Sequence, residues 1–496
     1  MENSLKNYWG KQFIETKNLA TQEVINPATE EVIAHVPLST NDEVNLAVKT
    51  AKEAFTSWKN TPTIDRIQPL FELKAKLEQN AHEISKIIVA ENGKTMKEAQ
   101  GDLLRGIQMV EVATSMPTLI MGDCQNQIAK GIDSNFYHRS LGVFAGITPF
   151  NFPAMVPFWF WPFAVASGNS YILKPSERVP LTSQYIFELI DQCDFPKGVI
   201  NMVHGGKDVV ESLCQHPDIA GVNFVGSTPV AKLVYDMAHK GYKRVQALGG
   251  AKNYMVITAD ADFNQSVKAM VDSCYGCAGE RCLAGSVLVA VGDQAYTKLK
   301  ERVLEEIGKV KVGNGIDPNT TLGPVISSQA KERIIQDIQK AVDEGATLLI
   351  DGRKNIQQDK GYFLNPTVIE NVTMGMEFAH KEIFGPVIGL MKVDSLDEAI
   401  KNINSLEYAN TTSLFTNNGS TMQKFVNEID PSMVGINLGV PAPMAFFSFG
   451  GSKASFFGDI KAHGPSSVEF FTQRQSIMTR WYSAGKEEII NPQWGK

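Results

Sequence analysis

The 496-residue sequence is poor in cysteine and has no long run of basic residues. Its six cysteines lie at positions 124, 193, 214, 274, 277 and 282, which is too sparse for a disulfide framework. The net charge is -7, from 47 basic and 54 acidic residues. We therefore expect no nucleic acid as the main partner.

The sequence also lacks a clear targeting or membrane segment. The first 15 residues carry charge without an apolar centre and are not rich in arginine, so they resemble neither a secretory signal nor a transit peptide. Residues 140–173 contain no charged side chain, but prolines at 149, 153, 157 and 162 interrupt them. We expect a buried strand, loop and helix start there, no membrane partner, and a cytoplasmic location.

Two short motifs suggest metal or phosphate chemistry but are incomplete. Cys274 and Cys277 form one CxxC pair, and no second pair or nearby histidine completes a zinc set. The segment ENGKT at 91–95 resembles the end of a P-loop, but Ile88 stands where that motif needs glycine. We expect two packed thiols, no metal ligands and no nucleotide-hydrolysing P-loop.

Helical and strand-like segments alternate along most of the chain. Residues 42–60 and 64–91 have the periodicity of amphipathic helices. Strands are expected at 141–148, 170–175, 198–205, 221–228, 254–262, 285–292, 346–352 and 385–393, with helices at 183–193, 207–215 and 229–241. This alternation favours right-handed crossovers, parallel sheets and two α/β domains. The tail after about 465 also alternates and predicts a further strand elsewhere.

The loop CYGCAGERC, which ends at Cys282, contains residues suited to a thiol nucleophile. Gly276 and Gly279 would let backbone amides approach an oxyanion, and Arg281 would favour the thiolate. On base rates, however, a lone cysteine is more often a buried structural residue. The nucleophile hypothesis therefore depends on the rest of the sequence.

Seven motifs supply that context. They are GITPFNFPAMVPFWF, ILKPSE, NFVGST, LGGAKN, GERC, KEIFGPV and FSFGGSKAS. In order and spacing they resemble the aldehyde dehydrogenase superfamily, from about Tyr8 to Tyr482. AGERC, INLGVPAPMAFF and GDLLRG are similar to the methylmalonate-semialdehyde dehydrogenase branch, which transfers its acyl group to coenzyme A (CoA).

The resemblance implies an α/β fold with two parallel-sheet domains and a small β oligomerisation arm. We expect the NAD-binding domain in residues 1–120 and 140–248, and the catalytic domain in 249–460. Residues 121–139 and 461–496 would form the oligomerisation arm and tail. The expected assembly is a homodimer or homotetramer.

By the same resemblance, Cys282 is the nucleophile, and the Asn151 amide and a backbone N–H bind the oxyanion. Taken alone, Asn151 could equally be a turn residue before proline. The expected NAD-binding residues are Thr148, Phe150, Lys174, Glu177, Arg178, Gly226, Ser227, Gly249, Glu382 and Phe384.

Several of these positions also have a physical rationale. Lys174 and Glu177 follow a buried strand, and a carboxylate there would disfavour the 2′-phosphate of NADP. Without the motif, the two residues could be an exposed ion pair. Gly226 and Ser227 begin a helix, whose N–H groups suit a pyrophosphate. The resemblance places Glu382 on the nicotinamide ribose, with the Phe384 ring beside it.

One expected carboxylate is missing. Hydrolytic aldehyde dehydrogenases carry a glutamate before the LGG segment as the general base for water. Here Ala247 or Leu248 occupies that position, depending on the alignment. A thiol needs less help than water, because part of it is thiolate near neutral pH. This favours CoA as the acyl acceptor.

Paired arginines suggest the substrate class. Arg105 in GDLLRG and Arg281 before the nucleophile could bind a carboxylate through charge-assisted bonds. Arg105 could instead form a surface or interface ion pair. The expected reaction is NAD-dependent oxidation of methylmalonate or malonate semialdehyde, with loss of carbon dioxide or bicarbonate, to propionyl-CoA or acetyl-CoA. A hydrolytic dehydrogenase and a non-catalytic protein with this fold remain alternatives.

Overall fold

The first of two large sheets has eight strands, in the order β2-β1-β9-β8-β7-β10-β11-β21. The computed structural model describes residues 4–16 and 19–480 of the chain. The strands are β1 (Asn7–Trp9), β2 (Gln12–Ile14), β7 (Val143–Ile147), β8 (Ser170–Lys174), β9 (Ile200–Met202), β10 (Ile219–Val225), β11 (Arg244–Leu248) and β21 (Phe456–Phe457). The five from β9 to β11 are parallel, as the alternation predicts.

Helices cover both faces of this sheet, because successive side chains of a strand point to opposite sides. Val143 and Ala145 of β7 pack into one core with α1 (Asn41–Trp58), α10 (Lys207–Gln215) and α11 (Thr228–Lys240). Phe144, between them, packs into the other core with α3 (Gln68–Gln79), α4 (Ala81–Asn92), α5 (Met96–Ala113) and α9 (Pro180–Asp191). The first sheet is therefore buried on both faces.

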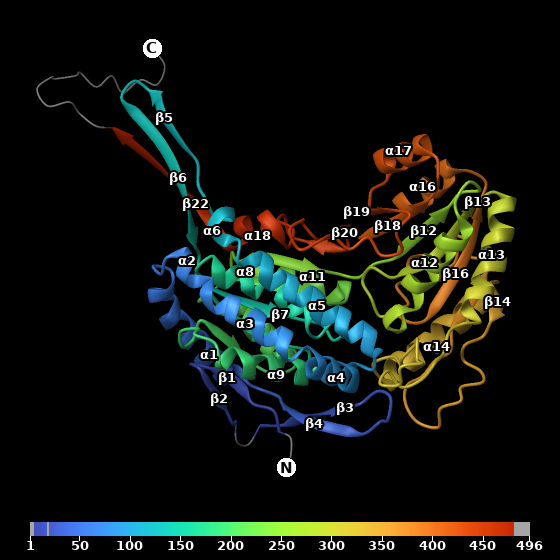
Figure 1. Cartoon of the computed structure of the whole chain (residues 1–496), viewed down its shortest axis with the longest axis horizontal. Helices are drawn as coiled ribbons and strands as arrows, with labels where there is room; N and C mark the ends of the chain where they lie inside the picture. The colour runs from blue at the N-terminus through green and yellow to red at the C-terminus, as the bar shows by residue number, and fades with distance from the viewer. Residues whose placement is uncertain (1–3, 17–18, 481–496) are drawn as a thin grey trace, which may run out of the picture.

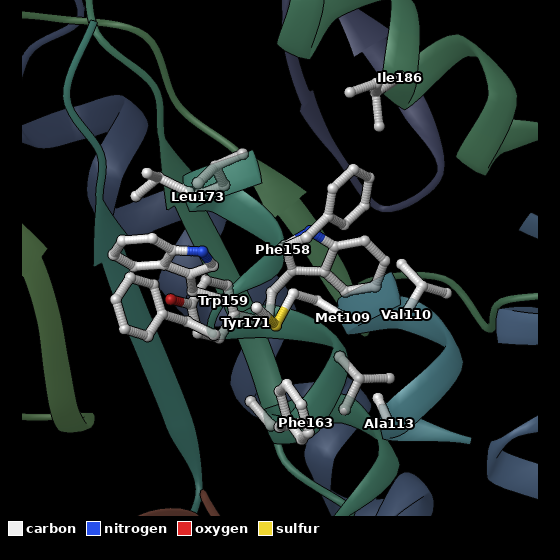
Figure 2. Close-up of a cluster of buried hydrophobic side chains, with 14 of the residues drawn as sticks. Met109, Val110, Ala113, Phe158, Trp159, Phe163, Tyr171, Leu173 and Ile186 are labelled. Atoms are coloured by element: carbon white, nitrogen blue, oxygen red, sulfur yellow. The ribbon is translucent and has the colours of Figure 1, made fainter. Parts of the chain in front are cut away.

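The uncharged stretch after residue 140 supplies much of the second of these cores. It forms β7 and two short helices, α7 (Met155–Phe158) and α8 (Trp161–Ala166). Figure 2 shows Phe158 and Phe163 packed beside Met109 and Ala113 of α5. The stretch is buried protein interior, as its prolines predict.

Two predicted elements differ in the structure. The single helix expected over 64–91 is wrong: α2 (Thr63–Arg66), α3 and α4 are separate helices. Pro69 stands in the first turn of α3, and Asn80 ends α3 and precedes α4. The alternation at 466–471 is also not a strand, because α18 (Gly464–Phe471) packs Val468 and Phe470 into the core as a helix. The predicted tail strand begins only at Thr472.

The second sheet has seven strands, in the order β14-β15-β16-β13-β12-β18-β19. They are β12 (Asn253–Ile257), β13 (Gly285–Val291), β14 (Thr347–Ile350), β15 (Thr367–Glu370), β16 (Val387–Val393), β18 (Thr411–Phe415) and β19 (Met433–Ile436). All neighbours are parallel except β14 and β15. The helices around it include α12 (Phe263–Tyr275), α13 (Asp293–Ile307), α14 (Ser328–Asp343), α16 (Leu396–Asn404) and α17 (Gly419–Glu428).

A third sheet projects from the body as an arm (Figure 1). It joins β5 (Cys124–Ala129), β6 (Ile132–Ser140) and β22 (Thr472–Arg480), all antiparallel. Two β sheets with helices plus this arm are the architecture that the sequence predicts. The part of the predicted tail beyond residue 480 lies outside the described residues.

The remaining elements are short. They are β3 (Thr21–Ile25), β4 (Val32–Pro37), α6 (Met116–Leu119), α15 (Glu377–His380), β17 (Tyr408–Ala409) and β20 (Ser452–Lys453).

Among the helices of residues 4–16 and 19–480, none combines the length and apolar character needed to span a membrane.

Candidate active site

The predicted cofactor-binding residues between positions 148 and 249 gather at one edge of the first sheet. Thr148 and Phe150 follow β7, Lys174 ends β8, Gly226 and Ser227 follow β10, and Gly249 follows β11. These are the carboxyl ends of neighbouring parallel strands. The chain leaves β7 for β8 on one side and later returns to β10 on the other. Ligands of open α/β sheets bind at such a switch point.

The other predicted residues lie at the amino ends of strands in the second sheet. Cys282 precedes β13, and Glu382 and Phe384 precede β16. The short segment from Gly249 to Lys252 links β11 directly to β12. It therefore joins the carboxyl edge of the first sheet to the amino edge of the second, and the predicted site lies between the two sheets.

The Cys282 loop has an unusual backbone that several contacts hold. Cys277 and Ala278 both have left-handed φ angles, 52° and 54°, within a short 3-10 turn. The carbonyl of Cys282 accepts hydrogen bonds from the side-chain amides of Asn253 and Asn410, each at 2.9 Å. These bonds fix the backbone of the nucleophile candidate from the first residue of β12 and from the residue that precedes β18.

The electrostatic setting of Cys282 differs from the one expected. Burial raises the pKa of the Cys282 thiol to about 12, and the nearby Glu382 carboxylate adds to this rise. Arg281 opposes it only weakly. Arg281 thus acts in the expected direction, because it lowers the pKa of the thiol, but burial and the Glu382 carboxylate outweigh it.

Arg281 has other neighbours. Its Nη2 lies 3.5 Å from the Glu98 carboxylate of α5. The guanidinium also packs on Gly276, where an added Cβ would lie 2.4 Å from Nη2. Gly279 has a φ of 72° and packs against the carbonyl of Gly385. The two glycines predicted to expose amides to an oxyanion thus make room for these close contacts.

Asn151 lies beside the nucleophile loop. It is buried, and its Nδ2 donates to the carbonyl of Glu280 at 3.0 Å. Its own carbonyl accepts a bond from Lys94 Nζ at 2.7 Å. The side-chain amide is therefore bonded to Glu280, which precedes Cys282 by two residues in the sequence. The role of this amide as an oxyanion donor stays a prediction.

The residues predicted to hold a dinucleotide form a suitable cradle. Lys174 donates to Glu177 at 2.8 Å, and this pair stands at the end of β8, while the neighbouring Arg178 is exposed. Ser227 is the N-cap of α11, yet its side chain makes no capping hydrogen bond. The first N–H groups of α11 and the Ser227 hydroxyl thus suit an anionic group such as a pyrophosphate.

The second half of the cradle approaches from the second sheet. The Glu382 carboxylate accepts the Ala251 N–H at 3.1 Å, and burial raises the pKa of Glu382 to about 7. An added Cβ on Gly250 would lie 2.5 Å from Glu382 Oε2, so a larger residue there would displace this carboxylate. The Phe384 ring, at a φ of 53°, meets the Phe150 ring edge-on with centroids 6.0 Å apart.

A cavity of about 1000 Å³ unites Cys282, Arg281 and Arg105. Arg105 is half-buried on α5 and donates to Gln108 Oε1 at 3.2 Å. The sequence analysis did not single out Trp159 and His463, which also line this cavity. Both are buried, and among the described residues their ring nitrogens have no hydrogen-bond partner, which only a structure can show.

The two residues expected to replace the general base, Ala247 and Leu248, both lie in the first sheet. Ala247 and Leu248 are buried in β11, where they pair with Phe457 and Phe456 of β21. Cys274 and Cys277 are buried free thiols. Within residues 4–16 and 19–480, no group of three or more His, Cys, Asp or Glu side chains is placed to hold a metal ion.

Known proteins match this chain over nearly its whole length. The aldehyde dehydrogenase family model matches residues 13–477. Malonate-semialdehyde dehydrogenase of Halalkalibacterium halodurans is 48% identical over 96% of this chain and 98% of its own length. Malonate-semialdehyde dehydrogenase 2 of Geobacillus kaustophilus is 46% identical over 96% and 99%.

Solved structures of similar proteins superpose on nearly the whole chain. Methylmalonate-semialdehyde dehydrogenase from Oceanimonas doudoroffii superposes with a TM-score of 0.95 at 41% identity, covering 97% of this chain and 99% of its own. A Sinorhizobium meliloti protein, described as a methylmalonate-semialdehyde dehydrogenase and complexed with NAD, has a TM-score of 0.96 at 36% identity, with 98% and 100% covered.

Proposed function

Because this chain belongs to the aldehyde dehydrogenase family, we propose that it oxidises malonate or methylmalonate semialdehyde with NAD and transfers the acyl group to CoA. Its relatives named malonate-semialdehyde dehydrogenase, at 46–48% identity over 96% of this chain, support this substrate class. The carboxylated substrate also fits the two arginines, Arg105 and Arg281, that line the cavity with Cys282.

The proposed chemistry begins at the Cys282 sulfur. It bonds to the aldehyde carbon, its proton leaves to solvent, and the Asn151 amide with a backbone N–H binds the oxygen anion. When bound, NAD⁺ would accept the hydride, and this two-electron oxidation would leave a thioester on Cys282. Thr148, Phe150, Lys174, Glu177, Arg178, Gly226, Ser227, Gly249, Glu382 and Phe384 would hold the dinucleotide. The substrate carboxylate is lost as carbon dioxide or bicarbonate, and a proton from solvent takes its place on the carbon. The thiolate of CoA displaces the Cys282 sulfur.

The observation that carries the choice of acceptor is the apolar pair Ala247 and Leu248. Both side chains are buried in β11, where hydrolytic relatives need a carboxylate. Water attack on a thioester needs a general base, whereas a thiol acceptor is itself partly ionised. We infer that CoA replaces water as the acceptor.

The test measures NADH formation from malonate semialdehyde, methylmalonate semialdehyde and propanal, with and without CoA. With CoA we expect steady turnover and acetyl-CoA or propionyl-CoA as products. Without CoA we expect a burst near one NADH per active subunit, followed by slow turnover. Cys282→Ala should form no NADH under either condition, and near-normal turnover in that variant would refute the nucleophile assignment.

A hydrolytic dehydrogenase is the second candidate, and one observation favours it. The Glu382 carboxyl lies close enough to Cys282 to raise its pKa, and its own pKa of about 7 would suit a general base. Equal steady-state rates with and without CoA, together with free acetate or propionate as product, would establish this alternative.

A further inference from the structure

The ENGKT segment at 91–95, which is not a P-loop, lies beside the candidate site. It spans the end of α4, the left-handed Gly93 with a φ of 88°, and Thr95, the N-cap of α5. Asn92, Lys94 and Thr95 are all buried, and Lys94 is only 2% exposed. A buried lysine needs compensating partners, so its contacts indicate what it does.

Two partners of Lys94, Asn151 and Phe152, belong to the loop that carries Asn151, and a third, Asp102, lies on α5. Lys94 Nζ donates to the Asn151 carbonyl at 2.7 Å and lies 3.0 Å from the Asp102 carboxylate. Its ammonium group also stands 4.1 Å from the centre of the Phe152 ring. Asp102 in turn accepts the backbone N–H of Met155 at 2.7 Å.

This loop has little regular structure of its own. Residues 148–154 belong to no helix or strand, and two of them are prolines, which donate no backbone hydrogen bond. Asn92 Nδ2 adds a bond to the Phe150 carbonyl at 3.0 Å. Phe150, Asn151 and Met155 are thus each held by a side chain from residues 92–102.

The same stretch also holds the nucleophile loop. Thr95 and Glu98 form a reciprocal capping box at the start of α5. The second oxygen of Glu98 accepts the backbone N–H of Cys277 at 2.6 Å and lies 3.5 Å from Arg281. Residues 92–102 therefore connect the Asn151 loop to the Cys282 loop.

We propose that Lys94 and Asp102 are positioning residues that set the location of the Asn151 amide relative to Cys282. This inference rests on the proposed function, because it assumes that Asn151 stabilises the oxyanion. Lys94 touches no reacting atom in this account. It holds the Asn151 backbone, and a displacement of about 1 Å at a catalytic group can cost about a hundredfold in rate.

The test removes both charges together, since a single substitution would leave the other charge buried and unpaired. Lys94→Met with Asp102→Leu keeps similar side-chain volumes. We expect the double variant to fold and to lose about 10- to 100-fold in the rate of the first NADH turnover, with KM changed less than about threefold. The rate of Cys282 alkylation by iodoacetamide should stay within about twofold, because the thiol itself is not moved.

A combination with Asn151→Ala separates positioning from general damage. If Lys94 and Asp102 act through Asn151, the triple variant should be no slower than Asn151→Ala alone. The proposal would be overturned if the loss of rate in the triple variant equalled the product of the losses in the double variant and in Asn151→Ala. Unchanged NADH formation in the double variant would also overturn it. Lys94→Arg, with Asp102 retained, keeps the positive charge. It should form NADH faster than the Lys94→Met/Asp102→Leu double variant and more slowly than the unaltered protein.

A matched control uses the ion pair between Lys300 and Glu370, whose atoms lie 2.6 Å apart on α13 and β15. Lys300→Met with Glu370→Leu should leave NADH formation unchanged. A similar loss in both double variants would mean that removing any ion pair impairs the enzyme, and would overturn the proposal. All of these assays measure the first NADH formed, which precedes transfer of the acyl group. If turnover did not depend on CoA, the proposed acceptor would be refuted, but the comparison of these variants would still hold.

Discussion

At the scale of single residues, the structure changes the role of the charges around Cys282. The sequence places Arg281 next to Cys282, which suggests that the guanidinium charge stabilises the thiolate. In the fold, Arg281 turns to Glu98 and Gly276, while Glu382, a hundred positions away in the chain, acts on the thiol. Neighbours of this kind follow from the meeting of two sheets. Sequence reasoning could therefore select Cys282 as a candidate nucleophile but could not predict the charges around it.

This environment predicts how Cys282 responds to pH in the absence of ligands. The pKa of the Cys282 thiol is raised to about 12, so the thiol form is retained through neutral pH. The rate of Cys282 alkylation by iodoacetamide should rise by about tenfold per pH unit from pH 7 to 10 without reaching a plateau. Peptide mass spectrometry would follow Cys282 apart from the exposed Cys124.

The contribution of Glu382 can be tested in the same assay. Since the pKa of the Glu382 carboxyl is about 7, its negative charge is mostly present above pH 7 and mostly lost below it. Glu382→Gln should therefore speed alkylation of Cys282 at pH 8–9 and change it little at pH 6. Arg281→Gln, which removes a weak opposing charge, should slow alkylation slightly. A slower reaction in Glu382→Gln at pH 9 would contradict this electrostatic account.

At the scale of elements, sequence periodicity predicts the central strands and most helices of the first sheet well. Helix α10 has the predicted bounds, and β7, β8 and β10 lie where their apolar runs indicate. The errors are local. The periodicity at 64–91 continues across Pro69 and Asn80, so it does not show where α2, α3 and α4 end. Residues 466–471 alternate, yet they form α18 because Val468, Phe470 and Phe471 are all buried there.

Helix α9 shows a contact that no local pattern could reveal. It begins at Pro180 after Val179, and it has no side-chain cap of its own. Glu91, at the end of α4, instead accepts the N–H groups of Leu181 at 2.7 Å and Thr182 at 3.0 Å, as well as the Thr182 hydroxyl. A residue ninety positions away thus satisfies the free donors of the first turn.

We expect Glu91→Ala to loosen this helix start. Each buried donor left unsatisfied costs about 1–3 kcal/mol, so amide hydrogen exchange at residues 181–182 should accelerate about 10- to 100-fold. Glu91→Gln keeps an acceptor oxygen and should show a smaller change. Glu78→Ala, at an exposed side chain on α3, is the control and should leave exchange at α9 unaltered. Equal exchange in the alanine variant and the unaltered protein would show that α9 is fixed by packing alone.

At the scale of the whole molecule, the site exists because two sheets present opposite edges to each other. The carboxyl ends of β7, β8, β10 and β11 face the amino ends of β13 and β16, with the Gly249–Lys252 segment between them. The ordered motifs and the family they resemble predict which residues meet there. The predicted domain boundaries at 120, 140, 248 and 460 remain predictions, although β21 at Phe456–Phe457 already belongs to the first sheet.

The projecting arm raises the question of what stabilises it. A three-stranded sheet alone is marginal unless one face is covered, yet β5, β6 and β22 leave most of their side chains at least partly exposed. Apolar side chains are among them: Ile128 is 36% exposed, Tyr137 45% and Met478 49%. Exposed apolar surface on a projecting sheet is typical of an interface. We therefore expect a second copy of the chain to cover the arm, in a homodimer or homotetramer.

Three lysine substitutions on the arm test this assembly. Ile128→Lys, Tyr137→Lys and Met478→Lys together place charges where the interface would bury apolar surface, and buried unpaired charges are strongly unfavourable. Light scattering after size-exclusion chromatography should give a multiple of the chain mass for the unaltered protein and the mass of one chain for the triple variant. Tyr242→Lys, at a side chain 97% exposed on the body, is the control and should keep the assembly. An unchanged mass in the triple variant would place the interface elsewhere, because three unpaired charges on the arm could not be accommodated in a close contact between copies.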